Sequence, residues 1–177
     1  MLANCRIYQF FCHAYHVTCS AIHLSYKKIK LYKANKIMRN TTQIKQTAQQ
    51  TQIAIIGAGF GGLAMAIRLL KNNIQDFVIL EKASDIGGTW RENQYPGAAC
   101  DVQSHMYSLS FAPKSDWSKR YAEAAEIFAY IQSLISTYDL KKYCQLNSEV
   151  IAAEYNKQRC DWTLTLNNDS TLIAQFV

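Results

Sequence analysis

Residues 53–62 read Ile-Ala-Ile-Ile-Gly-Ala-Gly-Phe-Gly-Gly, and this stretch decides the fold class. The apolar run over residues 52–56 ends at a glycine, which predicts a short buried strand. Over residues 61–72 apolar side chains recur at helical spacing, and two asparagines end that helix. Residues 77–80 predict a second buried strand. Strand, glycine turn, helix and strand together predict a parallel βαβ unit, and therefore an α/β fold of the Rossmann type.

The glycine spacing Gly57-x-Gly59-x-x-Gly62 indicates a dinucleotide site. The first glycine allows a tight turn, the second lets the backbone approach a pyrophosphate, and the third lets helix and strand pack closely. The helix start offers N–H groups and partial positive charge to phosphates. Glu81 ends the second strand, where a carboxylate accepts hydrogen bonds from a ribose. The alternative is a glycine turn without a ligand, and the strand, helix and acid around it favour the dinucleotide.

The kind of dinucleotide follows from two features. Glu81 disfavours the 2′-phosphate of NADP by charge repulsion, which leaves FAD or NAD. Gly87-Gly88-Thr89-Trp90 follows soon after, and this second glycine pair gives another close backbone approach that an NAD domain does not need. Trp90 can cover a flat ring, although taken alone it is equally typical of a core residue. The two features together favour FAD.

The remainder of the chain predicts a loop, a helix and a β meander. Residues 82–118 form a polar, glycine-bearing stretch that predicts a functional loop with short helical pieces. A helix face is predicted by Ile127, Ile131, Leu134, Ile135 and Tyr138. Residues 144–155, 161–166 and 170–177 alternate apolar and polar side chains, which predicts an antiparallel meander with a turn at 167–169. The last strand is expected to leave an exposed edge at residues 172–177.

Charge divides the chain into two parts. Residues 1–50 contain eight of the nineteen basic residues and none of the thirteen acidic ones, so residues 51–177 carry a net charge of −2. Nothing in the second part indicates a nucleic-acid partner. Residues 1–50 are interpreted as a basic extension, either disordered or upstream of a true translation start at Met38. The alternative is a basic arm that binds a membrane surface or a partner. Residues 51–177 are predicted to form a partial Rossmann-like domain.

Cysteine usage and hydropathy exclude other classes. No two of the six cysteines have CxxC spacing, which predicts free thiols in a reducing cytoplasm. No metal site is predicted, because the spacing fits no zinc pattern in the one candidate group, Cys5, Cys12, His13, His16 and Cys19. The longest apolar stretch, residues 7–24, is interrupted by polar side chains, so no membrane span is predicted.

Residues 52–177 resemble the FAD domain of Baeyer–Villiger-type flavin monooxygenases. The resemblance is carried by the glycine loop, Glu81, the Gly-Gly-Thr-Trp motif, and the run Tyr95-Pro96-Gly97-Ala98-Ala99-Cys100-Asp101-Val102 that continues through Ser104, Tyr107, Ser110 and Phe111. The glycine loop is widely shared, whereas the Tyr-Pro-Gly and Cys-Asp combination is far more specific. Residues 89–121, with Phe111-Ala112-Pro113 and Asp116-Trp117-Ser118, look most like the branch named after 4-hydroxyacetophenone monooxygenase.

The resemblance implies a role for each matching position. The positions that would line the pyrophosphate are Gly57, Gly59, Phe60 and Gly62, with Glu81 on the adenosine ribose. The positions on the flavin side would be Gly88, Thr89, Trp90 and Tyr107. Asp101 matches an acid placed by the flavin and paired with an arginine, which makes it the candidate catalytic residue. Its alternative role is a turn or a helix N-cap. Val150 would offer its backbone to the adenine.

The activity implied by the resemblance is an FAD- and NADPH-dependent monooxygenase that uses O₂ to convert a ketone to an ester. The alternatives are a nitrogen- or sulfur-oxidising flavin monooxygenase and a non-catalytic FAD-binding remnant. The sequence contains one GxGxxG loop, and the family's second loop for NADPH has no counterpart. The chain is therefore interpreted as the C-terminally incomplete front part of a longer enzyme, inactive by itself.

Overall fold

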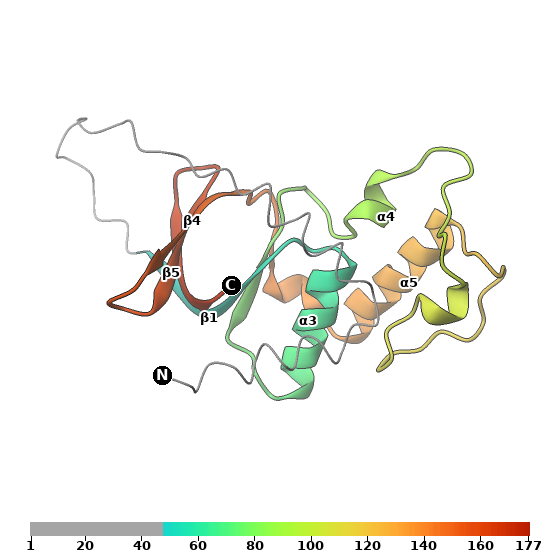
Figure 1. Ribbon diagram of the computed structural model, residues 1–177, viewed down its shortest axis with the longest axis horizontal. Coiled ribbons are helices and arrows are strands. Elements are labelled where there is room, and N and C mark those ends of the chain that lie inside the picture. The colour runs from blue at the N-terminus through green and yellow to red at the C-terminus, as the bar shows by residue number, and fades with distance from the viewer. Residues whose placement is uncertain (1–47) are drawn as a thin grey trace. The chain divides into compact units, whose positions relative to one another are not determined.

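The structure, a computed structural model, describes residues 48–177, which belong to one compact unit. The helices and strands are β1 (Gln49–Ile56), α3 (Phe60–Lys71), β2 (Phe77–Leu80), α4 (Thr89–Glu92), the 3-10 helix η1 (Ser104–Met106), α5 (Ala124–Thr137), the 3-10 helix η2 (Leu140–Tyr143), β3 (Cys144–Gln145), β4 (Val150–Asn156), β5 (Asp161–Leu166) and β6 (Thr171–Phe176). In Figure 1 the labelled helices α3, α4 and α5 lie to one side of the labelled strands β1, β4 and β5.

One mixed sheet of six strands organises the described residues, in the order β3-β2-β1-β6-β5-β4. β1 pairs in parallel with β2 on one side and with β6 on the other. β5 pairs antiparallel with β6 on one side and with β4 on the other. The parallel half brings the ends of β1 and β2 to the same edge of the sheet, where ligands bind in folds of this type.

The predicted βαβ unit is confirmed. β1 and β2 run in register from Ile53 opposite Phe77 to Ile56 opposite Leu80, and α3 connects them. α3 ends where the sequence indicates, because Asn72 caps it and the following asparagine adopts a positive φ of 60°. α5 is also confirmed, and its predicted apolar face is buried at Ile127, Ile131, Leu134 and Ile135.

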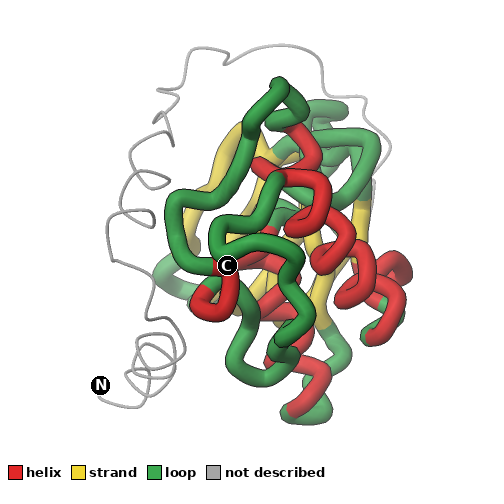
Figure 2. The backbone as a smooth tube through the Cα atoms, turned by 90° about the vertical axis from the view of Figure 1, so that its right-hand side faces the viewer, coloured by secondary structure: helices red, strands yellow, loops and turns green. Residues whose placement is uncertain are grey.

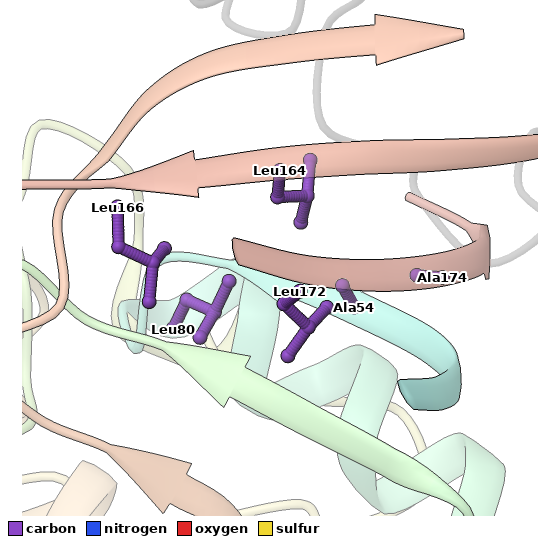
Figure 3. Packing of buried hydrophobic residues seen from close by; sticks show 6 residues of the cluster. All are labelled: Ala54, Leu80, Leu164, Leu166, Leu172 and Ala174. Carbon is purple, nitrogen blue, oxygen red and sulfur yellow. The ribbon is translucent and has the colours of Figure 1, made fainter. Parts of the chain in front are cut away.

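The meander is joined to the βαβ unit by a shared core. Ala54 of β1 and Leu80 of β2 pack in one buried cluster with Leu164, Leu166, Leu172 and Ala174 of β5 and β6. Figure 3 shows these side chains together, drawn from both halves of the sheet. The turn between β5 and β6 is confirmed at residues 167–169, with Asp169 at a positive φ of 63°. Burial of this cluster ties the two halves into one hydrophobic core.

The prediction of a single strand over residues 144–155 is wrong. Cys144–Gln145 forms the separate strand β3, which pairs in parallel with β2. The chain then turns through Asn147, whose φ is 53°. The N–H of Ser148 donates to the carbonyl of Glu81 at 2.8 Å, and β4 begins two residues later. Alternation alone cannot show that the backbone of this segment pairs first with β2 and only then with β5.

The predicted exposed edge at residues 172–177 is also wrong. β6 lies inside the sheet, between β1 and β5, and β4 is the outermost strand on that side. β1 begins at Gln49, three residues before the predicted strand, because Gln49 and Thr51 pair with Leu172 and Ala174 of β6. The predicted boundary at residue 50 therefore falls inside β1. The rest of the predicted basic extension, Met38 and the Cys/His group lie outside the described residues.

A long irregular segment connects α4 to α5. Residues 93–123 contain the single 3-10 turn η1 and two isolated β-bridges, which agrees with the predicted functional loop. We call residues 93–123 the site loop. In Figure 2 the loops, drawn in green, run beside and in front of the helices, drawn in red. Within residues 48–177, no helix has the length and apolar character needed to cross a membrane.

Candidate dinucleotide site

The glycine loop, residues 57–62, contains two glycines that the protein's own packing requires. Gly57 adopts a φ of 95°, which side chains rarely tolerate, and its N–H donates to the Leu80 carbonyl at 2.8 Å. A Cβ at Gly62 would overlap the Gly57 carbonyl oxygen and approach Ile55. These two positions hold α3 tightly against β1, as the glycine spacing predicts.

Gly59 differs, because the described residues do not require a glycine there. Its φ is −84°, and a Cβ would meet only the Cα of Gly88, at an ordinary contact distance of 3.7 Å. The first turn of α3 has no acidic residue, and Gly59 provides no capping side chain. The partial positive charge of this helix start is therefore not offset from within its first turn. The arrangement suits an anionic group placed close to the backbone.

Glu81 lies at the end of β2 and fastens the glycine loop. Its side chain is 4% exposed, and its two carboxylate oxygens accept the N–H groups of Ala58 at 2.6 Å and Ala83 at 3.0 Å. From its sequence position this carboxylate is expected to bind a ribose. In the structure it binds backbone N–H groups, one of them within the glycine loop, and so fixes the Ala58 peptide at the edge of the candidate site.

The second glycine pair packs directly on the first loop. Gly88 has a φ of 55°, and a Cβ on it would lie 2.8 Å from the Cα of Gly59. Gly87 donates its N–H to the Ala58 carbonyl at 3.0 Å. A Cβ at Gly87 would collide with the ring of Phe128 on α5. Both glycines of this pair are predicted from the sequence to allow a close backbone approach, although only Gly88 is assigned to the cofactor, and Gly87 is as tightly constrained.

Aromatic side chains line the region between the two glycine loops and the site loop. Trp90 donates its indole N–H to the Tyr107 hydroxyl at 3.1 Å, with the rings edge to face at 5.6 Å. Phe60 lies 5.3 Å from the Tyr107 ring and 6.1 Å from the Tyr130 ring. Three predicted positions are thus brought together. Tyr130 was not predicted, because its place on the helix resembles an ordinary core position.

Asp101 lies on the site loop with an exposed side chain. Within the described residues its carboxylate has no hydrogen-bond or salt-bridge partner, and the helix that follows is preceded by Gln103. The N-cap alternative is therefore wrong. Burial raises the pKa of the Tyr107 hydroxyl, and the nearby charge of Asp101 adds to this effect. Burial, with a smaller contribution from Asp101, also raises the pKa of the Cys100 thiol.

Val150 begins β4 and is half-buried against the shared core. The Ser148 bond to Glu81 brings this strand start to the edge of β2, near the predicted ribose position. Thr89 is exposed at the start of α4. Among the residues that the structure describes, no group of three or more His, Cys, Asp or Glu side chains could hold a metal.

The fold, the glycine loop and the second glycine pair, Gly87 and Gly88, define the class of protein as a Rossmann-like dinucleotide-binding domain. A family model described as NAD(P)-binding Rossmann-like domain matches residues 55–124. A Baeyer–Villiger monooxygenase of Streptomyces coelicolor is 42% identical over 120 residues, covering 68% of this chain and 23% of the relative. One from Pseudomonas aeruginosa is 42% identical over 131 residues, covering 73% and 25%. Over about 70% of its length, the chain matches the N-terminal region of the Baeyer–Villiger monooxygenase family.

Further relatives and solved structures agree. An FAD-binding monooxygenase of Emericella nidulans is 38% identical over 132 residues, covering 73% of this chain and 22% of the relative. A steroid monooxygenase bound to NADP superposes with a TM-score of 0.66 at 32% identity, covering 71% of this chain and 25% of that one. A cyclohexanone monooxygenase superposes with a TM-score of 0.68 at 32% sequence identity, covering 73% of this chain and 25% of that one. The chain spans about a quarter of the length of the curated relatives it matches.

Proposed function

We propose that this chain is the ADP-binding, N-terminal part of an FAD- and NADPH-dependent monooxygenase of the Baeyer–Villiger type. The proposal rests on the close backbone packing of Gly59 against Gly88, where a Cβ on Gly88 would lie 2.8 Å from the Gly59 Cα. The Tyr107 ring contacts the rings of Phe60 and Trp90 beside these two glycines. The glycine loop, which we propose binds phosphate, therefore lies beside a group of aromatic rings. FAD has a pyrophosphate and a flat ring system that match these two features.

The residues present fit the adenosine and pyrophosphate half of FAD. Gly57, Gly59, Phe60 and Gly62 would approach the pyrophosphate through backbone, and the start of α3 would complement its charge. Glu81 would accept ribose hydroxyls if they replaced one of its two backbone donors. Val150 would lie near the adenine, supported by the bond of its neighbour Ser148 to Glu81.

The flavin side would be formed by Gly88, Thr89, Trp90 and Tyr107. Exposed apolar side chains include Ile56 at the end of β1 and Val102 and Met106 on the site loop, and Met106 is 74% exposed. Exposed apolar groups gathered near a site are typical of surfaces that a ligand or further protein covers. When bound, FAD would supply the redox chemistry, taking hydride from NADPH and reacting with O₂. The protein would supply position and electrostatic field.

Asp101 is the proposed catalytic residue. Its support is an exposed carboxylate without a side-chain partner among the described residues, on the same loop as Tyr107. An acid in this position can hold a cationic side chain from another part of the protein by a charge-assisted hydrogen bond. In the whole enzyme Asp101→Ala should leave FAD bound and uncouple NADPH consumption from product formation. Unchanged coupling would return Asp101 to a structural role.

The substrate class we propose is a ketone, converted to an ester with O₂. Among the similar structures are cyclohexanone monooxygenases with bound cyclohexanone and with bound ε-caprolactone. The resemblance of residues 89–121 supports the 4-hydroxyacetophenone branch as the finer assignment. Nitrogen or sulfur oxidation is the second candidate, and the run of residues 95–101 speaks against it. The proposed compartment is the cytoplasm, supported by free thiols at Cys100, Cys144 and Cys160.

We also expect that this 177-residue chain does not oxidise NADPH. Hydride transfer requires the nicotinamide to be held against the flavin, and positioning supplies much of the rate. The sequence has a single GxGxxG loop, which the proposal assigns to FAD. The assay is purified chain with added FAD and NADPH, followed at the nicotinamide absorbance band. Steady NADPH loss above the free-flavin background would overturn the assignment and favour a self-sufficient reductase.

A further inference from the structure

The site loop has little regular structure, yet it carries Asp101 and Tyr107. A side chain from α5 holds its centre. Tyr130 is 6% exposed, and its hydroxyl accepts the N–H of Leu109 at 3.0 Å while donating to the carbonyl of Ala112 at 2.6 Å. Leu109 and Ala112 also bond to each other across a tight turn. One oxygen atom thus closes both ends of this turn.

The Tyr130 ring is linked to Tyr107 through the ring of Phe60. It meets the Phe60 ring at 6.1 Å, and Phe60 meets the Tyr107 ring at 5.3 Å. Tyr107 precedes Leu109 by two residues and holds the Trp90 indole. Tyr130 therefore reaches Tyr107 by two routes: its hydroxyl holds the backbone two residues further on, at Leu109, and its ring contacts Phe60, which contacts the Tyr107 ring.

The far side of the same turn has a separate anchor. The Phe111 ring lies under the guanidinium of Arg68 at 4.3 Å, and the Phe111 carbonyl accepts the ammonium of Lys71 at 3.1 Å. These exposed or half-exposed contacts attach the loop to α3. The Tyr130 bonds are more shielded from water, and bonds in such surroundings constrain geometry more strongly. Burial raises the pKa of Tyr130, so its hydroxyl keeps its proton and continues to donate at neutral pH.

We propose that Tyr130 is a positioning residue for the flavin side of the site, and that it acts by setting the place of Tyr107 and, through Tyr107, of Trp90. This inference rests on the proposed function for its role in binding FAD. Its geometric part, the link from the Tyr130 hydroxyl to Trp90, can be measured without any ligand.

The first test uses Tyr130→Phe in the full chain and the indole N–H resonances in a ¹⁵N–¹H spectrum. The sequence has three tryptophans, so each indole can be assigned by substitution. Trp117 contacts Tyr130 directly, whereas Trp90 is linked to it only through Tyr107. We expect the Trp90 resonance to move and that of Trp162, on β5, to stay. Tyr138→Phe is the matched control, because the Tyr138 hydroxyl has no hydrogen bond within residues 48–177, and it should leave Trp90 in place.

A second variant guards against loss of folding. Phe60→Leu interrupts the ring contact between Tyr130 and Tyr107 while leaving both hydroxyl bonds intact. The Trp90 resonance should move in this variant as well. An unmoved Trp90 resonance in either folded variant overturns the proposal.

The final arm is an FAD titration of the chain and its variants. Tyr130→Phe should weaken FAD binding about tenfold, which corresponds to ~1.4 kcal/mol. The effect should be absent in a Tyr107→Phe background, because a residue that acts through another gives non-additive changes. Additive effects, or unchanged affinity in Tyr130→Phe, count against the positioning role. If the unsubstituted chain binds no FAD, the proposed function fails, and the Trp90 resonance alone then decides on Tyr130.

Discussion

The glycine loop and the site loop border the same candidate site but are held in different ways. The glycine loop is fixed by local backbone geometry: Gly57 turns the chain, and Gly62 lets α3 lie against β1. The site loop is fixed by side-chain bonds between residues far apart in the sequence: Tyr130 of α5 bonds Leu109, and within the loop the Ser104 hydroxyl donates to the carbonyl of Lys119 at 2.7 Å. The first arrangement can be read from a short sequence motif. The second requires the folded chain.

The largest loss of stability is expected at Gly62, because the packing of α3 against β1 leaves no space there for a side chain. Gly62→Ala places a Cβ against the Gly57 carbonyl, and we expect a loss of about 3 kcal/mol in the free energy of unfolding. Gly61→Ala is the matched control in the same helix turn, since a Cβ there meets nothing within 4 Å. Urea denaturation followed by circular dichroism measures both. Equal stability of the two variants would show that the loop is not locally fixed.

Glu81→Gln should have the next largest effect. A carboxylate accepts from both Ala58 and Ala83, whereas the amide replaces one acceptor oxygen by a donor group. Loss of a charge-assisted bond at a buried position costs roughly 2 kcal/mol. The same denaturation experiment checks this value. A variant as stable as the unsubstituted chain would mean that Glu81 does not hold the glycine loop.

A smaller effect is expected on the aromatic side. Trp90→Phe removes the indole donor to Tyr107 and keeps an aromatic ring, so the unfolding free energy should fall by about 1 kcal/mol. Trp162→Phe on β5 is the control, because its indole has no hydrogen bond to the rest of the described chain. If both variants lose the same stability, the Trp90–Tyr107 bond contributes nothing specific.

The smallest effect is expected in the pH dependence of stability, at Cys144 of β3, the strand beside β2. Burial, and then the charge of Glu81, raise the pKa of the Cys144 thiol from the ordinary 9.0 to about 11. The unfolded thiol therefore loses its proton at a lower pH than the folded one. Its contribution to stability is fully present below pH 9.0 and is lost as the pH rises to about 11. Cys144→Ala should flatten the decline in melting temperature over this window.

Cys160→Ala provides the comparison for that experiment, because Cys160 is exposed at a turn. Its profile should match that of the unsubstituted chain. A Cys144→Ala profile that also matches it would contradict a buried, protonated thiol beside Glu81.

The predictable part of this molecule is the part whose signals are local. Gly57 and Gly62 encode a turn and a packing contact within six residues, so the order of strand, loop and helix is correctly predicted, although β1 begins three residues earlier than predicted. The strands of the meander are short and alternate, which reveals them but not their partners. The pairing of β6 with β1, and of β3 with β2, depends on contacts between residues far apart in the sequence.

The site shows the same division. Trp90 and Tyr107 are found by sequence resemblance, and the structure brings them together. Tyr130 escapes the sequence because a buried helix position gives no sign that its hydroxyl bonds to a loop twenty-one residues earlier. The pair Gly87-Gly88 is visible in the sequence, and the structure constrains both positions.

The proposed binding of the ADP half of FAD by the glycine loop can be measured by titrating the chain with FAD. We expect weak, saturable binding that ADP competes for and FMN does not, because FMN lacks the adenosine half. Gly59→Val should abolish this binding; a Cβ at Gly59 meets the protein only at the Cα of Gly88, at an ordinary 3.7 Å, and circular dichroism checks that the fold remains. Absence of saturable FAD binding, competition by FMN, or full retention of FAD by a folded Gly59→Val chain would contradict the account.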